Sequence, residues 1–86
     1  MYVILVYDID ESRVTKVNHL LKAYLLWVQN SVFEGDISES VYDRMCKRLG
    51  KIIKGSDSVL IYKFRTKIYV EKQTFGMEKG QTDNVI

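Results

Sequence analysis

The chain has 86 residues and a formal net charge of +2, from thirteen basic and eleven acidic side chains. This length predicts one small domain with a narrow margin of stability, which pairing with a second copy would improve. Hydrophobic residues make up 47% of the chain and proline is absent, which excludes a disordered or collagen-like protein. So small a net charge does not establish a polyanion partner. Whether the protein binds a polyanion depends on where its basic side chains are placed.

The sequence carries no signal for export or for a membrane. Its single cysteine, Cys46, excludes an internal disulfide and a multi-cysteine zinc site, as is typical of a reducing compartment. No apolar run approaches the ~20 residues of a membrane span, and no basic segment precedes the apolar N-terminus. We therefore expect a cytoplasmic protein without a membrane partner.

The first predicted element is a central strand over residues 2–7, an unbroken run of β-branched, aromatic and leucine side chains typical of a strand covered on both faces. Asp8, Asp10 and Glu11 follow where this strand emerges at the edge of the sheet, a common place for chemistry. We expect Asp8 to carry any chemistry. The alternative is that Asp8 accepts hydrogen bonds from backbone amides of the turn. Asp10 and Glu11 either add a water-mediated metal ligand or favour the start of a helix.

Apolar residues then recur at helical spacing from Arg13 to Leu26, which predicts an amphipathic helix over these residues. Ser12 is its expected N-cap, because a serine hydroxyl can accept a hydrogen bond from an amide of the first turn. Lys16 and His19 fall off the apolar stripe, and we interpret His19 as a surface histidine.

Side chains alternate with a period of two from Trp27 to Gly35, which predicts a strand. The pair Asn30 and Ser31 either bends this strand or divides it into two by a tight turn, and both alternatives stay open. We expect Gly35 and Asp36 to end it.

A second helix is predicted to begin at the N-cap Ser38, with Ile37 and Tyr42 packed together as a hydrophobic staple. Its apolar stripe continues to Ile53, and Gly55 is expected to stop it. Basic side chains gather near its C-terminal end, where they complement the helix dipole or, alternatively, bind nucleic acid. These are Lys47, Arg48, Lys51 and Lys54.

A further strand is predicted over residues 58–64, followed by a basic turn with Arg65 and Lys67, and by another strand over residues 68–75 that Gly76 closes.

The order strand, helix, strand, helix, strand, strand predicts an α+β ferredoxin-like sandwich, an antiparallel sheet with two helices on one face. The domain covers residues 1–76. The tail, residues 77–86, either frays or adds its last residues, 84–86, as an edge strand to a neighbouring subunit.

Four segments resemble, in order and spacing, the small CRISPR-associated adaptation protein family, the dimeric partner of the Cas integrase. They are YDI at Tyr7 to Ile9, VQNSVFEG at Val28 to Gly35, DSVLIY at Asp57 to Tyr62, and QTFG at Gln73 to Gly76. The resemblance covers nearly the whole chain, and VQ-x-SVFEG is its most specific motif. One position departs from the family: Trp27 stands where an arginine is common, so no phosphate contact is implied there.

The resemblance implies a homodimer in which Asp8 faces its own copy and the two aspartates hold Mg²⁺. It implies a metal-dependent endonuclease acting on RNA or DNA, and a part in the insertion of new spacers. Carried over by position, family site residues match Tyr7, Asp8, Ser31 and Phe33. Arg13 and Lys16 lie where some members have arginines.

Two functions from different classes follow. The first is a Mg²⁺-dependent endonuclease whose site spans a dimer axis, because one carboxylate per chain is a thin ligand set. Its phosphate contacts would come from Arg13, Lys16, Arg65 or Lys67. The second is a non-catalytic scaffold that bridges integrase subunits and clamps duplex DNA through Lys47, Arg48 and Lys51. The sequence has no Walker loop, HExxH motif or glycine-rich dinucleotide fingerprint, which argues against nucleotide-cofactor and zinc chemistry.

Overall fold

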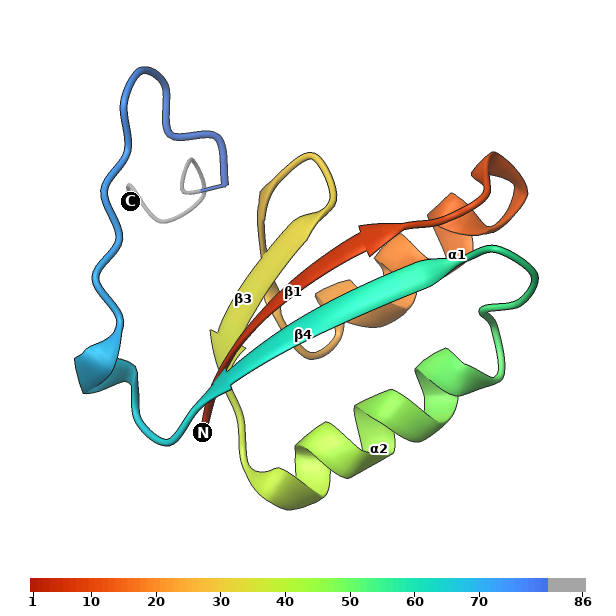
Figure 1. Ribbon diagram of the computed structural model, residues 1–86, viewed down its shortest axis with the longest axis horizontal. Coiled ribbons are helices and arrows are strands. Elements are labelled where there is room, and N and C mark those ends of the chain that lie inside the picture. The colour runs from red at the N-terminus through yellow and green to blue at the C-terminus, as the bar shows by residue number, and fades with distance from the viewer. Residues whose placement is uncertain (81–86) are drawn as a thin grey trace.

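A computed structural model describes residues 1–80, so the edge strand predicted at residues 84–86 lies outside the described chain. Figure 1 shows its elements. In chain order they are β1 (Tyr2–Asp8), α1 (Glu11–Lys22), β2 (Leu26–Gln29), β3 (Val32–Asp36), α2 (Glu39–Gly50), β4 (Ser58–Phe64) and a 3₁₀ turn, η1 (Lys67–Tyr69). Within residues 1–80, no helix is long and apolar enough to cross a membrane.

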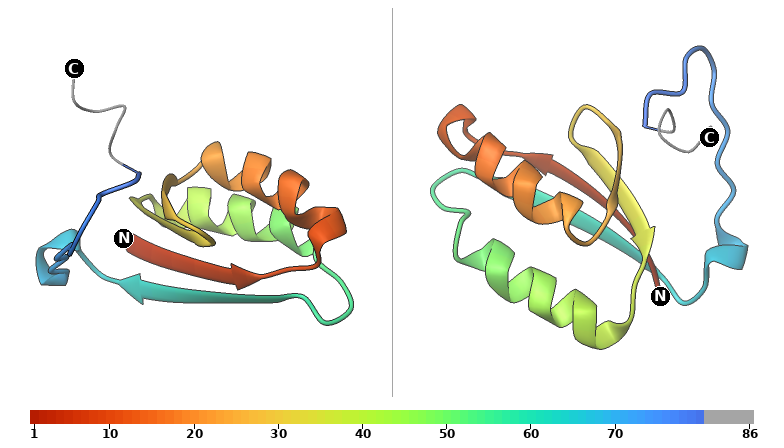
Figure 2. Two further views of the ribbon diagram at one scale, coloured as in Figure 1. Left: turned by 90° about the horizontal axis from the view of Figure 1, so that it is seen from above. Right: turned by 180° about the vertical axis from the view of Figure 1, so that it is seen from behind.

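The strands form one antiparallel sheet in the order β2-β3-β1-β4, with β1 bonded to β3 on one side and to β4 on the other. Both helices lie on the same face of this sheet, as the view from above in Figure 2 shows. This arrangement confirms the predicted α+β ferredoxin-like sandwich and the central place of β1.

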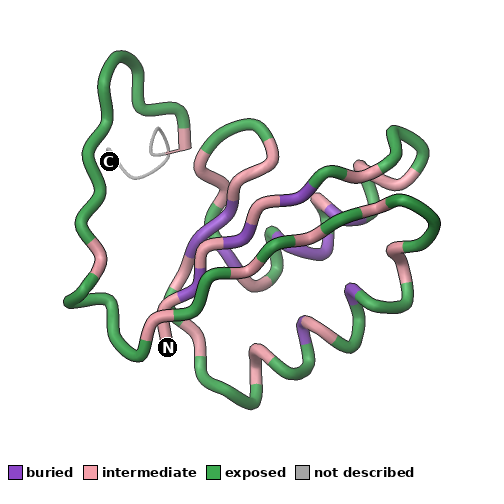
Figure 3. The backbone as a smooth tube through the Cα atoms, viewed as in Figure 1, coloured by how far each residue is buried: buried purple, intermediate pink, exposed green. Residues whose placement is uncertain are grey.

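Side chains of β1 alternate between the two faces of the sheet. Val3, Leu5 and Tyr7 point toward the helices and are buried, whereas Ile4 and Val6 lie on the opposite face and are half-buried. Figure 3 traces this buried layer through the sheet and the inner sides of both helices. In the single chain the helices therefore cover only one face of β1. We call the other the open face.

The first helix begins earlier than predicted and ends earlier. Asp10, not Ser12, is the N-cap: its carboxylate accepts hydrogen bonds from the Ser12 backbone amide at 3.0 Å and from the Ser12 hydroxyl at 2.5 Å. The helix ends at Lys22 rather than at Leu26. Leu25, just beyond the helix, is still buried, which explains why the apolar spacing continued past the helix end.

The alternating segment around Asn30 forms two strands rather than one bent strand. Asn30 has φ of 45°, in the left-handed region that asparagine tolerates better than most residues. The indole N–H of Trp27 donates to the Asn30 carbonyl at 2.9 Å and closes the turn.

The second helix begins as predicted, with the Ser38 hydroxyl accepting from the Val41 amide at 3.3 Å. It ends at Gly50, so the prediction that Gly55 stops it is wrong. The Lys51 and Ile52 amides bond to carbonyls three residues back, a tightening at the end of the helix. Gly55 instead has φ of 64° in the loop that leads to β4.

The strand predicted over residues 58–64 is confirmed as β4, but the strand predicted over residues 68–75 is wrong. The chain there forms η1, in which the Thr66 hydroxyl accepts from the Ile68 amide at 3.4 Å, and then runs without regular structure. Ile68 and Phe75 are 80% and 88% exposed, so their strand-like alternation has no sheet to pack on in one chain.

Candidate active site

Asp8 is the last residue of β1, and its register partner is Ser58, the first residue of β4. Its side chain is exposed and belongs to the open face, because the residues next to it in the alternation, Tyr7 and Ile9, turn toward the core. Val6, two residues before Asp8 and on the same face, pairs with Leu60 of β4. Asp8 therefore stands at the edge of an apolar surface.

The hydrogen bonds of the turn that follows β1 use other carboxylates than that of Asp8. Asp10 caps α1, and the Asp10 amide donates to Asp57 Oδ1 at 2.9 Å. Glu11 lies in the first turn of the helix. Asp10 and Glu11 thus have the helix-starting role that the sequence allowed, and the turn bonds expected of a structural Asp8 are made by Asp10. The Asp8 carboxylate is exposed to an outside ligand.

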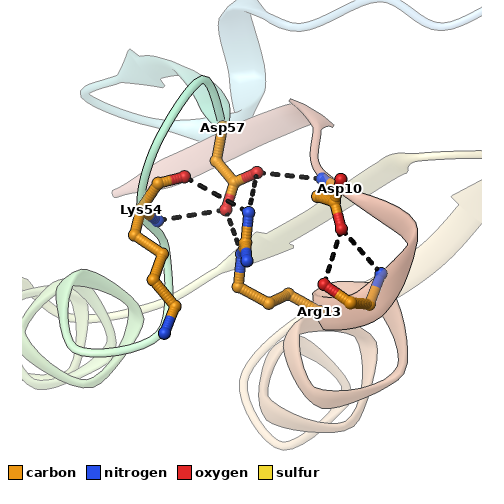
Figure 4. Close-up of polar contacts among 5 residues, drawn as sticks. Asp10, Arg13, Lys54 and Asp57 are labelled. Carbon is orange, nitrogen blue, oxygen red and sulfur yellow. Dashed lines mark hydrogen bonds and ion pairs between the residues drawn. The ribbon is translucent and has the colours of Figure 1, made fainter.

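Asp57 joins this turn to the loop before β4 (Figure 4). Its oxygens accept from Arg13 Nε at 2.6 Å and Nη2 at 3.0 Å, and from the Lys54 amide at 3.0 Å. The hydrogen bond from Arg13 is the largest cause that holds the pKa of Asp57 well below its ordinary value, and the same bond raises the pKa of Arg13.

Sequence reasoning did not single out Asp57, which it noted only as the first letter of DSVLIY. Its partner Arg13 is 44 residues away in sequence, so no local pattern links the two. The only available signal was an acidic residue just before a strand expected to pair with β1.

Tyr7 and Phe33 pack together on the helix-covered face, and the backbone of Ser31 bonds to that of Tyr7. The Tyr7 amide donates to the Ser31 carbonyl at 3.2 Å, and the Tyr7 and Phe33 rings stack with centroids 6.4 Å apart. The Tyr7 hydroxyl accepts from Asn18 Nδ2 at 2.8 Å. Tyr7 is 8% exposed and Phe33 is 0% exposed, so in this conformation they support β1 by packing. Their direct role at the site stays a prediction.

The basic residues expected to bind phosphate lie in different places. Arg13 and Lys16 belong to α1, which follows Asp8 directly, although Arg13 is bound to Asp57. Arg65 and Lys67 follow β4, which runs antiparallel to β1. The length of β4 separates them from Asp8 by about 20 Å at ~3.3 Å per residue. Within one chain, Arg65 and Lys67 do not share a site with Asp8.

A basic groove lies between α1 and α2, on the helix side of the molecule. Its volume is about 410 Å³, and it is lined by Lys16, His19, Leu20, Arg48, Lys51 and Ile52. Arg48 is held in place there, because its Nη1 donates to the Tyr24 hydroxyl at 2.9 Å and its guanidinium lies 5.7 Å from the ring centroid. Lys47 is exposed on α2 outside this lining.

A magnesium ion requires oxygen ligands, usually one or two carboxylates together with water. Within residues 1–80, no three histidine, cysteine or carboxylate side chains gather closely enough to hold a metal ion. Asp8 fits as one ligand, because it is an exposed carboxylate that the hydrogen bonds of the turn do not use. A second copy of the chain would supply another.

The chain is similar to known proteins over its whole length. A family model described as "CRISPR associated protein Cas2" matches residues 1–72. The chain is 44% identical to the CRISPR-associated endoribonuclease Cas2 of Pyrococcus furiosus, with all of both chains covered. It is 41% identical to the protein of that name from Methanocaldococcus jannaschii, covering all of this chain and 76% of the relative. A solved structure titled "Crystal structure of cas2" aligns with a TM-score of 0.86 and 48% identity, over 92% of this chain and 90% of that one.

Proposed function

The chain belongs to the CRISPR-associated protein Cas2 family, and on this premise we propose that it is a Mg²⁺-dependent endonuclease of CRISPR antiviral defence that works as a homodimer. The relatives from P. furiosus and M. jannaschii are named endoribonucleases, which supports a nuclease with RNA as its first candidate substrate. Duplex DNA is the second. The single observation that carries the proposal is the exposed Asp8 carboxylate at the rim of the open face.

The open face supports the dimer. Leu60 is 54% exposed and Tyr62 is 56% exposed, and they pair in register with Val6 and Ile4 of β1. Contiguous apolar surface of this kind usually marks an interface in a protein of this size. In a twofold dimer the same patch serves both subunits, so a contact through this face with its axis near the end of β1 would bring the two Asp8 residues to one shared rim.

Each chain contributes definite groups to hydrolysis of a phosphodiester. The two Asp8 carboxylates would hold the cation, and Arg13, in the first turn of the helix that follows Asp8, would attract the phosphates of the substrate. Bound Mg²⁺ would supply positive charge against the phosphate and lower the pKa of water. Since two facing carboxylates repel each other, the pair is expected to come together only when a cation is present.

Replacing Asp8 tests this proposal. We expect Asp8→Ala and Asp8→Asn to cut single-stranded RNA at least about 100-fold more slowly than the wild type, because a metal ligand is removed. Asp36→Asn is the matched control, because Asp36 pairs with the N-terminal amine at 3.2 Å, at the opposite end of β1. This variant should cleave RNA at the wild-type rate. Assays in Mg²⁺ and in EDTA, on RNA and on duplex DNA, give the substrate and the metal dependence. Equal cleavage by wild type and Asp8→Ala, or cleavage by neither, would rule out the nuclease.

The basic groove favours a second function, a scaffold that holds duplex DNA and bridges integrase subunits during spacer acquisition. Lys16, Arg48 and Lys51 face one groove on the side of the molecule away from the open face. We expect Arg48→Glu and Lys51→Glu to weaken DNA binding and to reduce the salt slope by about one for each phosphate that is no longer bound. Arg44→Glu is the control, because it makes the same charge reversal on the same helix but outside the groove lining. This variant should bind DNA as the wild type does. An unchanged salt slope in the groove variants would exclude this surface.

A further inference from the structure

Asp57 is a buried charge that the proposed chemistry does not use. Its side chain is 1% exposed, and a carboxylate out of water is costly unless it is paired and hydrogen-bonded. Each of its oxygens accepts two hydrogen bonds, Oδ1 from the Asp10 amide and Arg13 Nη2, and Oδ2 from Arg13 Nε and the Lys54 amide. Figure 4 shows these bonds converging on one side chain. The carboxylate is therefore fully satisfied and held in one orientation.

The donors come from three different segments of the chain. Asp10 lies in the turn after β1, Arg13 in the first helix, and Lys54 in the loop after α2. Asp8 is two residues before Asp10, and its register partner Ser58 directly follows Asp57. The bonds of Asp57 thus link the segments that follow and precede the strands at the end of the sheet where Asp8 lies.

We propose that Asp57 is a positioning residue of the nuclease site, which fixes the turn after β1 and thereby the direction of the Asp8 carboxylate. This inference rests on the proposed function. Two like-charged carboxylates must be held within reach of one cation, and an error of about 1 Å in such a site can cost 100-fold in rate. Arg13 accordingly acts first as a partner of Asp57. Nε and Nη2 of its guanidinium are engaged, which leaves Nη1 for a phosphate.

The test compares Asp57→Asn with the wild type. Asparagine keeps the size of the side chain but loses the charge and one acceptor, so the pairing with Arg13 fails. We expect the Mg²⁺ concentration for half-maximal binding, measured by calorimetry, to rise about 10- to 100-fold, as for other residues that support a metal ligand. We also expect kcat for RNA to fall with little change in KM, because the change displaces Asp8 and leaves the binding of RNA intact. Asp36→Asn, whose ion pair lies at the other end of β1, is the control and should match the wild type.

Arg13→Gln provides a second variant at the more exposed end of the pair, where Arg13 is 21% exposed and folding is less at risk. Hydrogen exchange of the Asp10 amide, which donates to Asp57, measures the turn directly and independently of activity. We expect faster exchange in both variants. If Asp57→Asn loses only stability, with Mg²⁺ binding and kcat per folded molecule as in the wild type, the positioning role is excluded while the nuclease stands. If the wild type neither binds Mg²⁺ nor cleaves, both proposals fall.

Discussion

Acidic side chains near the end of β1 divide into those that build the turn and the one that does not. Asp10 caps α1 and Asp57 holds Arg13, whereas Asp8 faces outward beyond these bonds. A carboxylate without a structural task at the end of a central strand is a natural metal ligand. Asp10 and Asp57 thus have structural roles, and Asp8 is the carboxylate that is left to bind a ligand.

Acid should weaken the fold through Asp57. Its pKa is lowered in the folded chain, chiefly by Arg13, so it contributes stability that is complete above the unfolded pKa, about 4, and is lost as the pH falls from there toward the lower folded value. Asp57→Asn should therefore lower Tm clearly at pH 7 and much less at pH 2. Thermal unfolding across this range checks it. A Tm difference that stays constant with pH would contradict the assignment of the charge to this pair.

Substitutions of Phe33 distinguish a packing role of this residue from a direct role in cleavage. It is fully buried and stacks on Tyr7 under β1, so Phe33→Ala should cost about 3–5 kcal/mol of folding free energy. Phe33→Leu should cost less. Both should retain the cleavage rate per folded molecule, measured under conditions where each variant is folded. A large fall in kcat for a folded Phe33→Leu would instead assign Phe33 to the site.

Elements whose signals are local could be predicted from the sequence. The start of α2 at the Ser38 cap and the bounds of β4 follow from a capping side chain and from alternation, which need no distant partner. The segment 68–75 alternates in the same way, yet a strand also needs a free sheet edge beside it, and that depends on the rest of the molecule. For the same reason the exposed position of Asp8 at the end of the first strand could be predicted, while the bonds of Asp57 to Arg13 and Asp10 could not.

An ion pair links the segment after η1 to the sheet. Lys72 Nζ lies 2.5 Å from a carboxylate oxygen of Glu34, a residue of β3 that is 8% exposed. Burial, and then the neighbouring Glu34, raise the pKa of Tyr2 to about 12. Farther along, the backbone of Gly80 lies so close to the Trp27 carbonyl that a side chain there would collide with it. The segment thus contacts the sheet at Lys72 and at Gly80.

Glu34→Gln should release this segment. Glutamine has the shape of glutamate but lacks the charge that attracts Lys72. Residues 70–80 should therefore become cleavable by protease while the sheet stays intact. Limited proteolysis with mass spectrometry detects the site of cutting. Asp36→Asn, a carboxylate change two residues along on β3, is the control. Equal resistance of Glu34→Gln and wild type would show that the ion pair does not hold the segment.

At the scale of the whole molecule, the helices cover one face of the sheet, whereas on the other face Leu60 and Tyr62 of β4 are left exposed beside β1. An 86-residue domain has little stability to spare, and burying the open face against a second copy would add to it. The unbroken apolar run of β1 makes sense in such a dimer, because its outward residues, Ile4 and Val6, would then be covered too.

A charge on the open face should separate the dimer. We expect Leu60→Asp to sediment as a monomer and to lose cleavage, because Leu60 is 54% exposed at the centre of the proposed contact. Ser40→Asp places the same charge in the exposed first turn of α2, where it is tolerated, and should remain dimeric and active. A Leu60→Asp protein that stays dimeric would place the interface elsewhere.

The sharing of one site by two Asp8 residues can be tested most directly by mixing subunits. Wild type and Asp8→Ala are combined in varying proportions, subunit exchange is completed, and cleavage of RNA in Mg²⁺ is measured. If both carboxylates are needed, activity follows the square of the wild-type fraction and falls to about a quarter in an equal mixture. A linear fall, to about half in the same mixture, would show that each chain acts alone and would contradict the shared site.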